Sequence, residues 1–280
     1  IWQIILNLFI LNFRPSKTAK AYKEIWMNDK NMSPLLYYTQ KQAEKISSSF
    51  SKENIIIDFA MRYGNPSIKY KIHKLHKIGC ENLVILPLYP QYAAATTATV
   101  CDEVYRTLMK MRWQPSLKII PHYESDQLYI DALVNSINKK INEIGWKPDL
   151  IIASYHGIPK KYFDKGDPYH CYCHKTTRLI SEKFSSIKIK TTFQSRFGPQ
   201  EWLQPYTDKT LESLPKEGVK NVLTICPGFA SDCVETLEEI QIQAKESFLN
   251  SGGENFDMVP CLNDNNDHIN LLKSLIERNI

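Results

Sequence analysis

The sequence predicts an α/β protein made of two Rossmann-like halves, each with a parallel sheet, and an active-site cleft between them. Short apolar runs bounded by turn residues alternate with segments of helical periodicity, and such alternation favours parallel sheets covered on both faces. The same plan occurs before and after residue 124, with no low-complexity linker. We expect an N-terminal half over 1–124, a C-terminal half over 125–264, and a helix over 265–280 that packs back on the N-terminal half.

Six apolar runs predict strands, and a segment with helical periodicity follows each of them. The expected strands are 54–64, 82–90, 117–123, 149–157, 187–195 and 221–229. The expected helices are 66–79, 97–112, 125–145, 171–185, 207–217 and 231–250. In open α/β sheets ligands bind where the strands end, so functional residues are expected at the ends of these strands.

The opening run "IWQIILNLFILNF" predicts a buried or amphipathic helix. It is shorter than the roughly 20 residues that span a bilayer, and it lacks the basic region and cleavage site of a signal peptide. Lys17, Lys20 and Lys23 follow it, so peripheral contact with anionic lipid is the less favoured alternative. Because residue 1 is Ile rather than Met, we expect a segment with the first strand of the N-terminal half to precede it.

Composition excludes several classes of protein. The 280 residues are 43% hydrophobic, which is enough for a large core. The net charge of +5 comes from 35 basic and 30 acidic residues without a basic stripe, so nucleic acid is not an expected partner. Seven unevenly spaced cysteines favour a reducing compartment, the cytoplasm, over a disulfide framework. No G-x-G-x-x-G motif follows a strand, so no nucleotide cofactor is implied.

The segment "HCYCH" offers four candidate metal ligands in five positions: His170, Cys171, Cys173 and His174. Zinc needs about four ligands around one ion, but adjacent residues rarely point at one centre, and no second pair with finger-like spacing exists. We therefore interpret the segment as surface residues with one or two partly buried thiols.

His156 stands at the end of an apolar run that predicts a strand. In parallel sheets, functional side chains are common where the strands end. Glu235, Glu238 and Glu239 are spaced i, i+3 and i+4 in a helix after another strand, so they are expected to share one face. Glu235 is expected to face the same cleft as His156, where a histidine and a carboxylate can bind a divalent cation or transfer protons. Three histidines in Lys- or Asn-rich helical segments are predicted to be solvated: His73, His76 and His268.

Three long motifs resemble the ferrochelatase family, whose members insert ferrous iron into a porphyrin in the last step of haem synthesis. They are "SYHGIPKKYFDKGDPY", "TFQSRFGPQEWLQPYTD" and "CPGFASDCVETLEEI". Further matches are "RPSKTAKAY", "MRYGNPS" and "LPLYPQYAAATTATV". The resemblance covers essentially the whole chain in the family's order. In that family an opening segment with a Gly-rich strand end precedes the point that corresponds to Ile1.

The resemblance implies that His156 and Glu235 are the catalytic and iron-binding pair, with Glu239 as an additional candidate ligand. It also implies six porphyrin-binding positions: Arg14, Tyr22, Ser33, Arg62, Tyr63 and Trp202. A porphyrin is a flat apolar disc with propionates at one edge, which suits aromatic walls with Arg, Tyr and Ser donors at the rim. The expected partners are protoporphyrin IX and Fe²⁺, with no cofactor beyond the substrate iron.

Some residues depart from the family pattern. The animal enzymes have His at the position of Cys233 and end in a cysteine cluster for an iron–sulfur centre, whereas no Cys follows Cys261. The chain therefore resembles bacterial forms, and no cluster is expected. Gln243 follows Glu239 one turn later, where some members have an acid, so the case for a second, outer metal site is weak.

The sequence thus predicts a protoporphyrin ferrochelatase, which is a lyase, and leaves two alternatives open. One is a cobalt chelatase of the same fold acting on a less oxidised tetrapyrrole, because one histidine and one carboxylate encode metal identity poorly. The other is a non-catalytic porphyrin- or haem-binding protein that retains the cleft.

Overall fold

The computed structural model describes residues 11–51 and 54–280, with side chains from residue 18 onward. It contains a two-stranded and a four-stranded sheet, both parallel, so the predicted α/β class with two parallel sheets is confirmed. Within the described residues, no helix is both long and apolar enough to cross a membrane.

The larger sheet has the strand order β4-β3-β5-β6. Its strands are β3 (Leu150–His156), β4 (Lys188–Gln194), β5 (Asn221–Ile225) and β6 (Asn255–Met258). Every residue of β3 except His156 is buried, as expected for an inner strand of a parallel sheet. The register pairs His156 with Gln194, so the last residues of β3 and β4 lie side by side at one edge.

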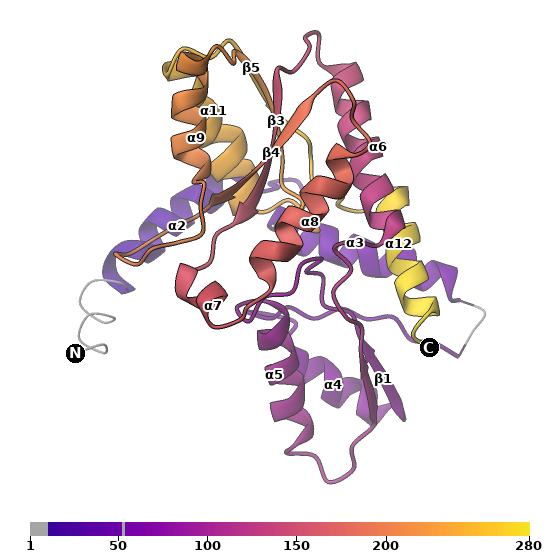
Figure 1. The fold of residues 1–280 in the computed structure, drawn as a ribbon. Helices are drawn as coiled ribbons and strands as arrows, with labels where there is room; N and C mark the ends of the chain where they lie inside the picture. The colour runs from indigo at the N-terminus through magenta and orange to yellow at the C-terminus, as the bar shows by residue number, and fades with distance from the viewer. Residues whose placement is uncertain (1–10, 52–53) are drawn as a thin grey trace.

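Helices cover both faces of this sheet (Figure 1). One face packs on α6 (Gln127–Glu143) and α8 (Tyr169–Ser181), and the other on α9 (Thr207–Ser213), the π-helix η3 (Leu237–Ala244) and α11 (Lys245–Asn250). In β3, Ile151 and Tyr155 pack in the first core and Ile152 in the second. Successive side chains of a strand alternate between faces, so His156 shares the face of Ile152 and is directed towards η3.

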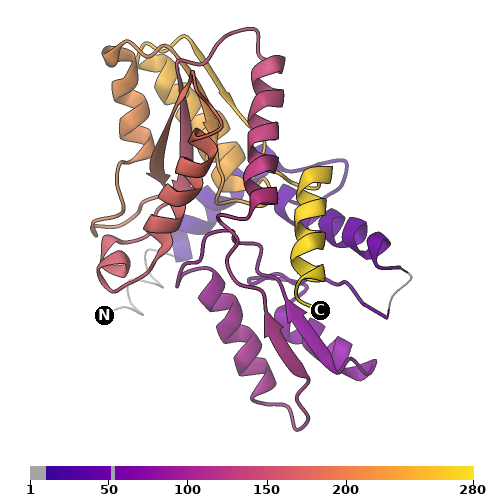
Figure 2. The same ribbon diagram turned by 45° about the vertical axis from the view of Figure 1, so that its right-hand side comes forward.

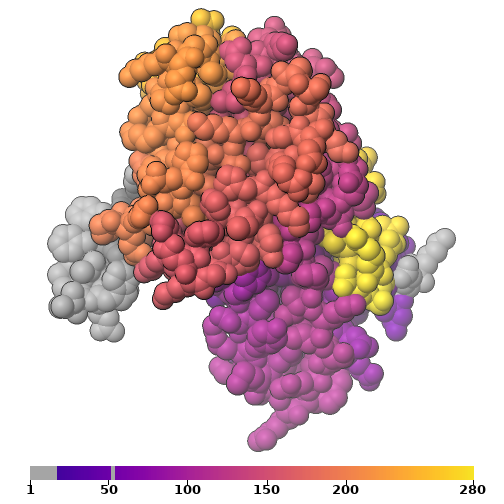
Figure 3. All heavy atoms as spheres, in the orientation of Figure 1, coloured from indigo at the N-terminus to yellow at the C-terminus, as the bar shows by residue number. Residues whose placement is uncertain are grey.

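The smaller sheet forms the lobe at the bottom of Figure 3. It pairs β1 (Asn82–Ile85) with β2 (Ser116–Ile119), and α4 (Ile68–Lys77) and α5 (Thr97–Leu108) pack in the same lobe. This lobe has its own hydrophobic core, which is formed by buried side chains of these elements: Ile68, Ile72, Leu83, Val100, Val104 and Leu108.

Helices from both ends of the chain pack on the part of the molecule with the larger sheet. Near the start lie α2 (Leu11–Ile25) and α3 (Pro34–Ser49), and α12 (Asn266–Glu277) lies near the end. In Figure 2, α12 lies beside α6 with α3 behind it, and it contacts both. Helix α2 contacts η3 and the short α10 (Val234–Thr236), so the first described helix packs against the segment that carries Glu235. The remaining short elements are α7 (Lys160–Asp164) and the 3₁₀ helix η2 (Leu214–Glu217).

The structure corrects three expectations. The described part of 54–64 forms only an isolated bridge at Met61 and no strand, although its apolar side chains still pack against the core. The strand β6 was not predicted. His268 is not solvated but 1% exposed, because it lies on the inner face of α12, where its Nδ1 is 2.6 Å from the carbonyl oxygen of Asn263.

Candidate active site

His156 is half-buried at the end of β3, and one of its ring nitrogens forms a hydrogen bond. Its Nδ1 lies 2.6 Å from the carbonyl oxygen of Gly157. A carbonyl oxygen only accepts hydrogen bonds, so Nδ1 carries the proton and donates it. The lone pair of Nε2 is therefore the one that can take a metal ion or a proton.

Glu239 lies in η3 and reaches back to the end of β4. The backbone N–H of Ser195 donates to Oε1 over 2.7 Å, while the Ser195 hydroxyl and the Gln194 amide donate to Oε2. Burial raises the pKa of the Glu239 carboxyl, whereas these hydrogen bonds and the positive charge of protonated His156 lower it. Glu239 thus lies within electrostatic range of His156, and its net raised pKa makes it a better proton acceptor than an exposed glutamate.

Gln194 links these groups and was not singled out from the sequence. Its side chain is 4% exposed and fully used: Oε1 accepts a hydrogen bond from the Ser154 hydroxyl at 2.7 Å, and Nε2 donates to the backbone oxygen of Glu235 at 2.7 Å. It therefore ties β3 and β4 to the helix that carries both carboxylates. The sequence feature that could have identified Gln194 is its position near the end of an expected strand, which is also the position of His156.

Glu235 faces residues from the N-terminal part of the chain. Burial raises the pKa of Tyr22 in α2, and the negative charge of Glu235 raises it further. Burial also raises the pKa of Tyr89, with added contributions from Tyr63 and Glu235 that Arg62 opposes. Segments on both sides of residue 124 therefore meet around Glu235. Tyr89, which follows β1, is a second residue that the sequence did not single out.

Trp202 and Arg62 occupy well-defined places near this region. Trp202 is 6% exposed and donates its indole N–H to the Phe197 carbonyl over 3.0 Å. A Cβ on Gly157 would lie 3.2 Å from the Trp202 ring and 2.9 Å from the Gln194 carbonyl oxygen, so only glycine fits beside His156. The Arg62 guanidinium lies over the Tyr63 ring, 4.5 Å from its centroid, and Tyr63 is 73% exposed.

Two of the expected porphyrin-binding residues, Ser33 and Arg14, are not linked to His156 or the carboxylates by a contact among the described residues. The Ser33 hydroxyl caps α3 by accepting a hydrogen bond from the Leu36 N–H at 3.4 Å. Arg14 belongs to α2, but its side chain lies outside the described residues. Residues 1–10 of the apolar opening run also lie outside them, so the expectations for that run remain predictions.

The three carboxylates of "ETLEE" do not share one face as expected. The helix continues as a π-helix from Leu237, and Glu238 accepts a hydrogen bond from Gln243, five residues later, at the exposed surface. Widening a helix in this way changes which residues share a face, and such stretches are frequent at functional sites. Glu239 turns inwards instead.

No group of three or more His, Cys, Asp or Glu side chains that could hold a metal ion occurs within 18–51 and 54–280. Closed structural metal sites use about four protein ligands.

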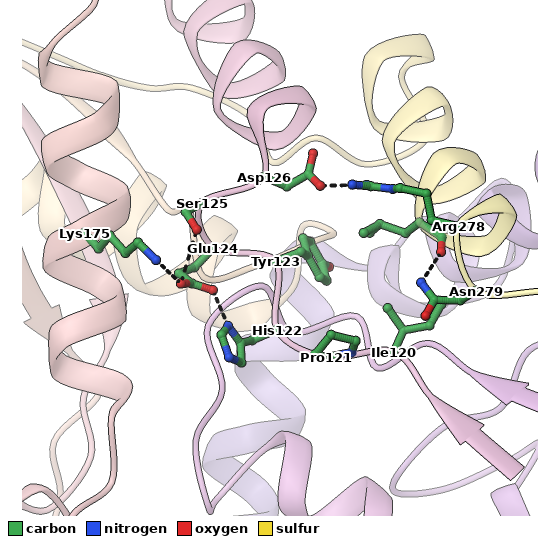
Figure 4. Close-up of a pocket in the computed structure, with 11 residues that line it drawn as sticks. Ile120, Pro121, His122, Tyr123, Glu124, Ser125, Asp126, Lys175, Arg278 and Asn279 are labelled. Atoms are coloured by element: carbon green, nitrogen blue, oxygen red, sulfur yellow. Dashed lines mark hydrogen bonds and ion pairs between the residues drawn. The ribbon is translucent and has the colours of Figure 1, made fainter.

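A cavity of about 330 Å³ lies away from this region, between the segment after β2 and α12 (Figure 4). The charged groups that line it are already paired. Glu124 lies 2.9 Å from Lys175 Nζ and 2.6 Å from His122 Nδ1, and Arg278 lies 2.6 Å from Asp126. A second cavity of about 180 Å³ is lined by Trp202 and residues near it. Neither cavity is lined by His156 or Glu235.

The two parallel sheets and their covering helices are arranged as in solved structures of the chelatase fold. SirB from Bacillus subtilis with Fe³⁺ has a TM-score of 0.62 at 12% identity, covering 88% of this chain and 91% of its own. The sirohydrochlorin chelatase SirB in complex with cobalt, from a subspecies of the same organism, gives a TM-score of 0.61 at 8% identity, with coverage of 86% and 88%. At these identities the likeness concerns the fold alone.

The chain belongs to the ferrochelatase family. The family model Ferrochelatase matches residues 1–280. The ferrochelatase of Allorhizobium ampelinum is 55% identical over 100% of this chain and 82% of its own length. That of Rhizobium meliloti is 53% identical over 100% of this chain and 83% of its own length. The resemblance inferred from the sequence motifs is therefore confirmed.

Proposed function

We propose that this protein is a ferrochelatase that inserts Fe²⁺ into protoporphyrin IX to form protohaem, the last step of haem synthesis. One observation carries the proposal within this family: His156 presents Nε2, the ring nitrogen that does not bond to Gly157, and lies within electrostatic range of the half-buried Glu239, whose pKa is raised.

In the proposed reaction, Fe²⁺ replaces the two pyrrole N–H protons, so the products are the iron porphyrin and two protons. His156 Nε2 accepts a pyrrole proton, and Glu239 is the next acceptor. Glu235 supplies negative charge that attracts the ion. The pocket favours a distorted macrocycle, because pyrrole nitrogens that point out of the ring plane resemble the transition state for metal entry.

For the porphyrin we propose contacts with Tyr22, Arg62, Tyr63 and Trp202. The electrostatic coupling of Tyr22 and Tyr89 to Glu235 supports this proposal, as does the packing of Trp202 on Gly157. Arg14 and Ser33 complete the proposed set at the rim.

Replacing Arg14 by Ala is expected to raise the KM for porphyrin more than it lowers kcat, because a propionate contact exists in both the ground and transition states. A charge-assisted hydrogen bond contributes about 1.5–3 kcal/mol, so the expected rise is on the order of tenfold to a hundredfold. Steady-state kinetics measure it, and an unchanged KM would remove Arg14 from the pocket.

We also infer a cytoplasmic protein with peripheral contact to an anionic membrane surface. Lys20 and Lys23 in α2 are exposed and follow the apolar opening run, which is a composition suited to anionic lipid. The Lys20→Glu/Lys23→Glu variant should lose flotation with phosphatidylglycerol-containing vesicles. The Lys183→Glu/Lys216→Glu variant, with the same charge change at exposed positions elsewhere, should retain it. Equal flotation of both variants would contradict the contact.

The proposal includes no cofactor beyond the substrate iron and no iron–sulfur cluster. Analysis of iron and acid-labile sulfide in anaerobically purified protein is expected to find no stoichiometric sulfide. Two sulfides per chain would instead indicate a cluster.

Anaerobic incubation of the protein with Fe²⁺ and protoporphyrin IX tests the function. We expect the visible bands of the free porphyrin to be replaced by those of protohaem with multiple turnovers. Faster insertion of Co²⁺ into a less oxidised tetrapyrrole would favour the cobalt chelatase. Porphyrin binding without insertion of any ion would favour the non-catalytic alternative.

A further inference from the structure

Helix α8 places two imidazoles one turn apart. His170 and His174 are spaced i, i+4, and their ring centroids are 4.4 Å apart with the planes inclined by 49°. Residues at this spacing lie on one face of a helix. The two histidines of the H-E-x-x-H motif bind one zinc ion from the same spacing.

The ring nitrogens of this pair are not used elsewhere in the described structure. Neither His170 nor His174 has a hydrogen bond or ion pair within 18–51 and 54–280, whereas His122, His156 and His268 each have an engaged Nδ1. The contacts of His170 are aromatic: its ring centroid lies 5.1 Å from that of Phe163 and 5.7 Å from that of Phe193. These contacts restrict the ring of His170 and leave its nitrogens free.

The spacing of the rings fits a shared metal ion. Two imidazole nitrogens bound tetrahedrally at about 2.0–2.1 Å from a zinc ion lie about 3.4 Å apart, which places the ring centroids about 5 Å apart. The observed 4.4 Å differs by roughly half an ångström, which a small rotation of the exposed His174 side chain can supply.

We propose that His170 and His174 form a binding site for a divalent transition-metal ion, separate from His156. Imidazole ligands suit Fe²⁺, Ni²⁺, Cu²⁺ and Zn²⁺, and for a given site the affinity rises from Fe²⁺ through Ni²⁺ to Cu²⁺ and is lower again for Zn²⁺. Two protein ligands leave the other positions to water, so the ion exchanges readily. The proposal goes beyond the insertion reaction, because it needs neither porphyrin nor His156.

Of the two thiols of "HCYCH", Cys173 is excluded from this site, because it is 0% exposed and its thiol is surrounded by core residues. Cys171 is exposed. It points about 100° around the helix from His170, but it precedes His174 by three residues and is therefore its neighbour on the helix surface. The Cys171→Ser variant below distinguishes this thiol from the imidazoles.

The site adjoins the wall that contains Trp202. His170 lines the cavity of about 180 Å³ together with Phe163, Glu201 and Trp202. Lys160 also lines it, but its charge is balanced by Asp164, whose carboxylate oxygens lie 2.9 and 3.0 Å from Nζ. Trp202 in turn packs against Gly157, the neighbour of His156. An ion on α8 would therefore lie close to the proposed insertion site without sharing its ligands.

Isothermal titration of the full chain with Zn²⁺, in the absence of porphyrin, tests the proposal. Removal of one of two ligands should weaken this class of site at least tenfold, since loss of even an outer-shell partner costs tenfold to a hundredfold. We expect that loss in His174→Gln and in His170→Gln, with no further loss in the double variant. Thermal melting checks the fold of each variant, and the exposed position of His174 makes His174→Gln the decisive one.

Two controls complete the experiment. His73→Gln removes an exposed histidine from α4, and Cys171→Ser removes the exposed thiol of α8; both should bind Zn²⁺ like the parent chain. Identical isotherms for the parent chain and folded His174→Gln would overturn the proposal. Loss of the site in Cys171→Ser would overturn it too, because the thiol would then be the ligand. Because His156 is intact in every variant, failure here leaves the proposed insertion reaction untouched.

Discussion

At the scale of single residues, one hydrogen bond determines which nitrogen of His156 can react. The bond from Nδ1 to the Gly157 carbonyl leaves Nε2 as the acceptor, and glycine is required at 157 because both Trp202 and the Gln194 backbone approach it closely. The nearby carboxylates have different surroundings. Glu239 is tied to the end of β4, whereas Glu235 faces tyrosines from the N-terminal part. We therefore assign proton acceptance to Glu239 and attraction of the ion to Glu235.

Replacing Glu235 by Gln should lower the rate of metal insertion on the order of a hundredfold, because the charge that attracts the ion is lost while the shape is kept, and close unit charges near a protein surface interact by about 4 kcal/mol. Glu238→Gln is the matched control. Glu238 accepts a hydrogen bond from Gln243 at the exposed surface. The activity of the Glu238→Gln variant should therefore differ from that of the parent chain by less than about twofold. Initial rates of metal insertion are measured for both variants. An equal loss of rate in Glu235→Gln and Glu238→Gln would mean that the helix acts as a diffuse acidic patch.

Burial of His268 should make stability fall in mild acid. Burial lowers the pKa of His268 from 6.5 to about 4, so between these values the folded state binds fewer protons than the unfolded state. The contribution is fully present above about pH 6.5 and is lost as the pH falls towards 4, by about 3 kcal/mol in total. Urea unfolding from pH 4 to 7 measures it, and His268→Gln should flatten the curve by that amount. If the free energy of unfolding depends on pH in the same way in the parent chain and in His268→Gln, the effect does not come from His268.

The sequence could not predict that His268 is buried. The residues around it, "NDNNDHIN", suggest a solvated segment, but its partner is a backbone carbonyl that only tertiary packing supplies. His156 could be predicted, because the strand before it is a continuous apolar run and the residue that follows such a strand lies at the sheet edge.

At the scale of elements, the π-helix η3 sets the arrangement of the carboxylates. A regular α-helix would place Glu235, Glu238 and Glu239 on one face, but η3 turns Glu238 to the surface and Glu239 towards β4. Gln194 holds this helix against the sheet through the backbone of Glu235 and the carboxylate of Glu239. We therefore regard Gln194 as a positioning residue.

Replacing Gln194 by Met keeps the volume but removes these hydrogen bonds. Buried partners left unsatisfied should lower the free energy of unfolding by about 1–3 kcal/mol. We expect kcat to fall about tenfold with the KM for porphyrin little changed, because the carboxylates lose their position relative to His156. Gln200→Met, the same change at an exposed position, is the control. An unchanged kcat in destabilised Gln194→Met would reduce Gln194 to a structural role.

Most strands and helices could be predicted from apolar periodicity, and the exceptions have physical reasons. The run 54–64 is apolar enough for a strand, but within its described part only Met61 has a bridge partner. The strand β6 is four residues long and carries Asp257, so its pattern is too short to recognise. The π-helix η3 contacts α2 and is hydrogen-bonded to the end of β4 through Glu239, and the spacing of the glutamates does not encode these contacts.

At the scale of the whole molecule, the site joins parts of the chain that are far apart in sequence. Tyr22 in α2 and Tyr89 after β1 both respond to the charge of Glu235, while His156 and Glu239 belong to the larger sheet and its covering helix. The sequence predicted two halves with parallel sheets, but it could not predict which tyrosines meet Glu235. That convergence depends on how α2 packs against η3.

We propose that His156 drives metal insertion into a porphyrin that other residues hold. Anaerobic Fe²⁺ insertion by His156→Ala, with porphyrin affinity measured in parallel by fluorescence quenching, tests it most directly. We predict that turnover falls at least a hundredfold, within the range of lost acid–base catalysis, while porphyrin affinity stays within about threefold, since the disc is held mainly by apolar contacts. His122→Ala, which removes a histidine that follows β2 and has both ring nitrogens engaged, should retain turnover. Near-normal turnover in folded His156→Ala would contradict the account.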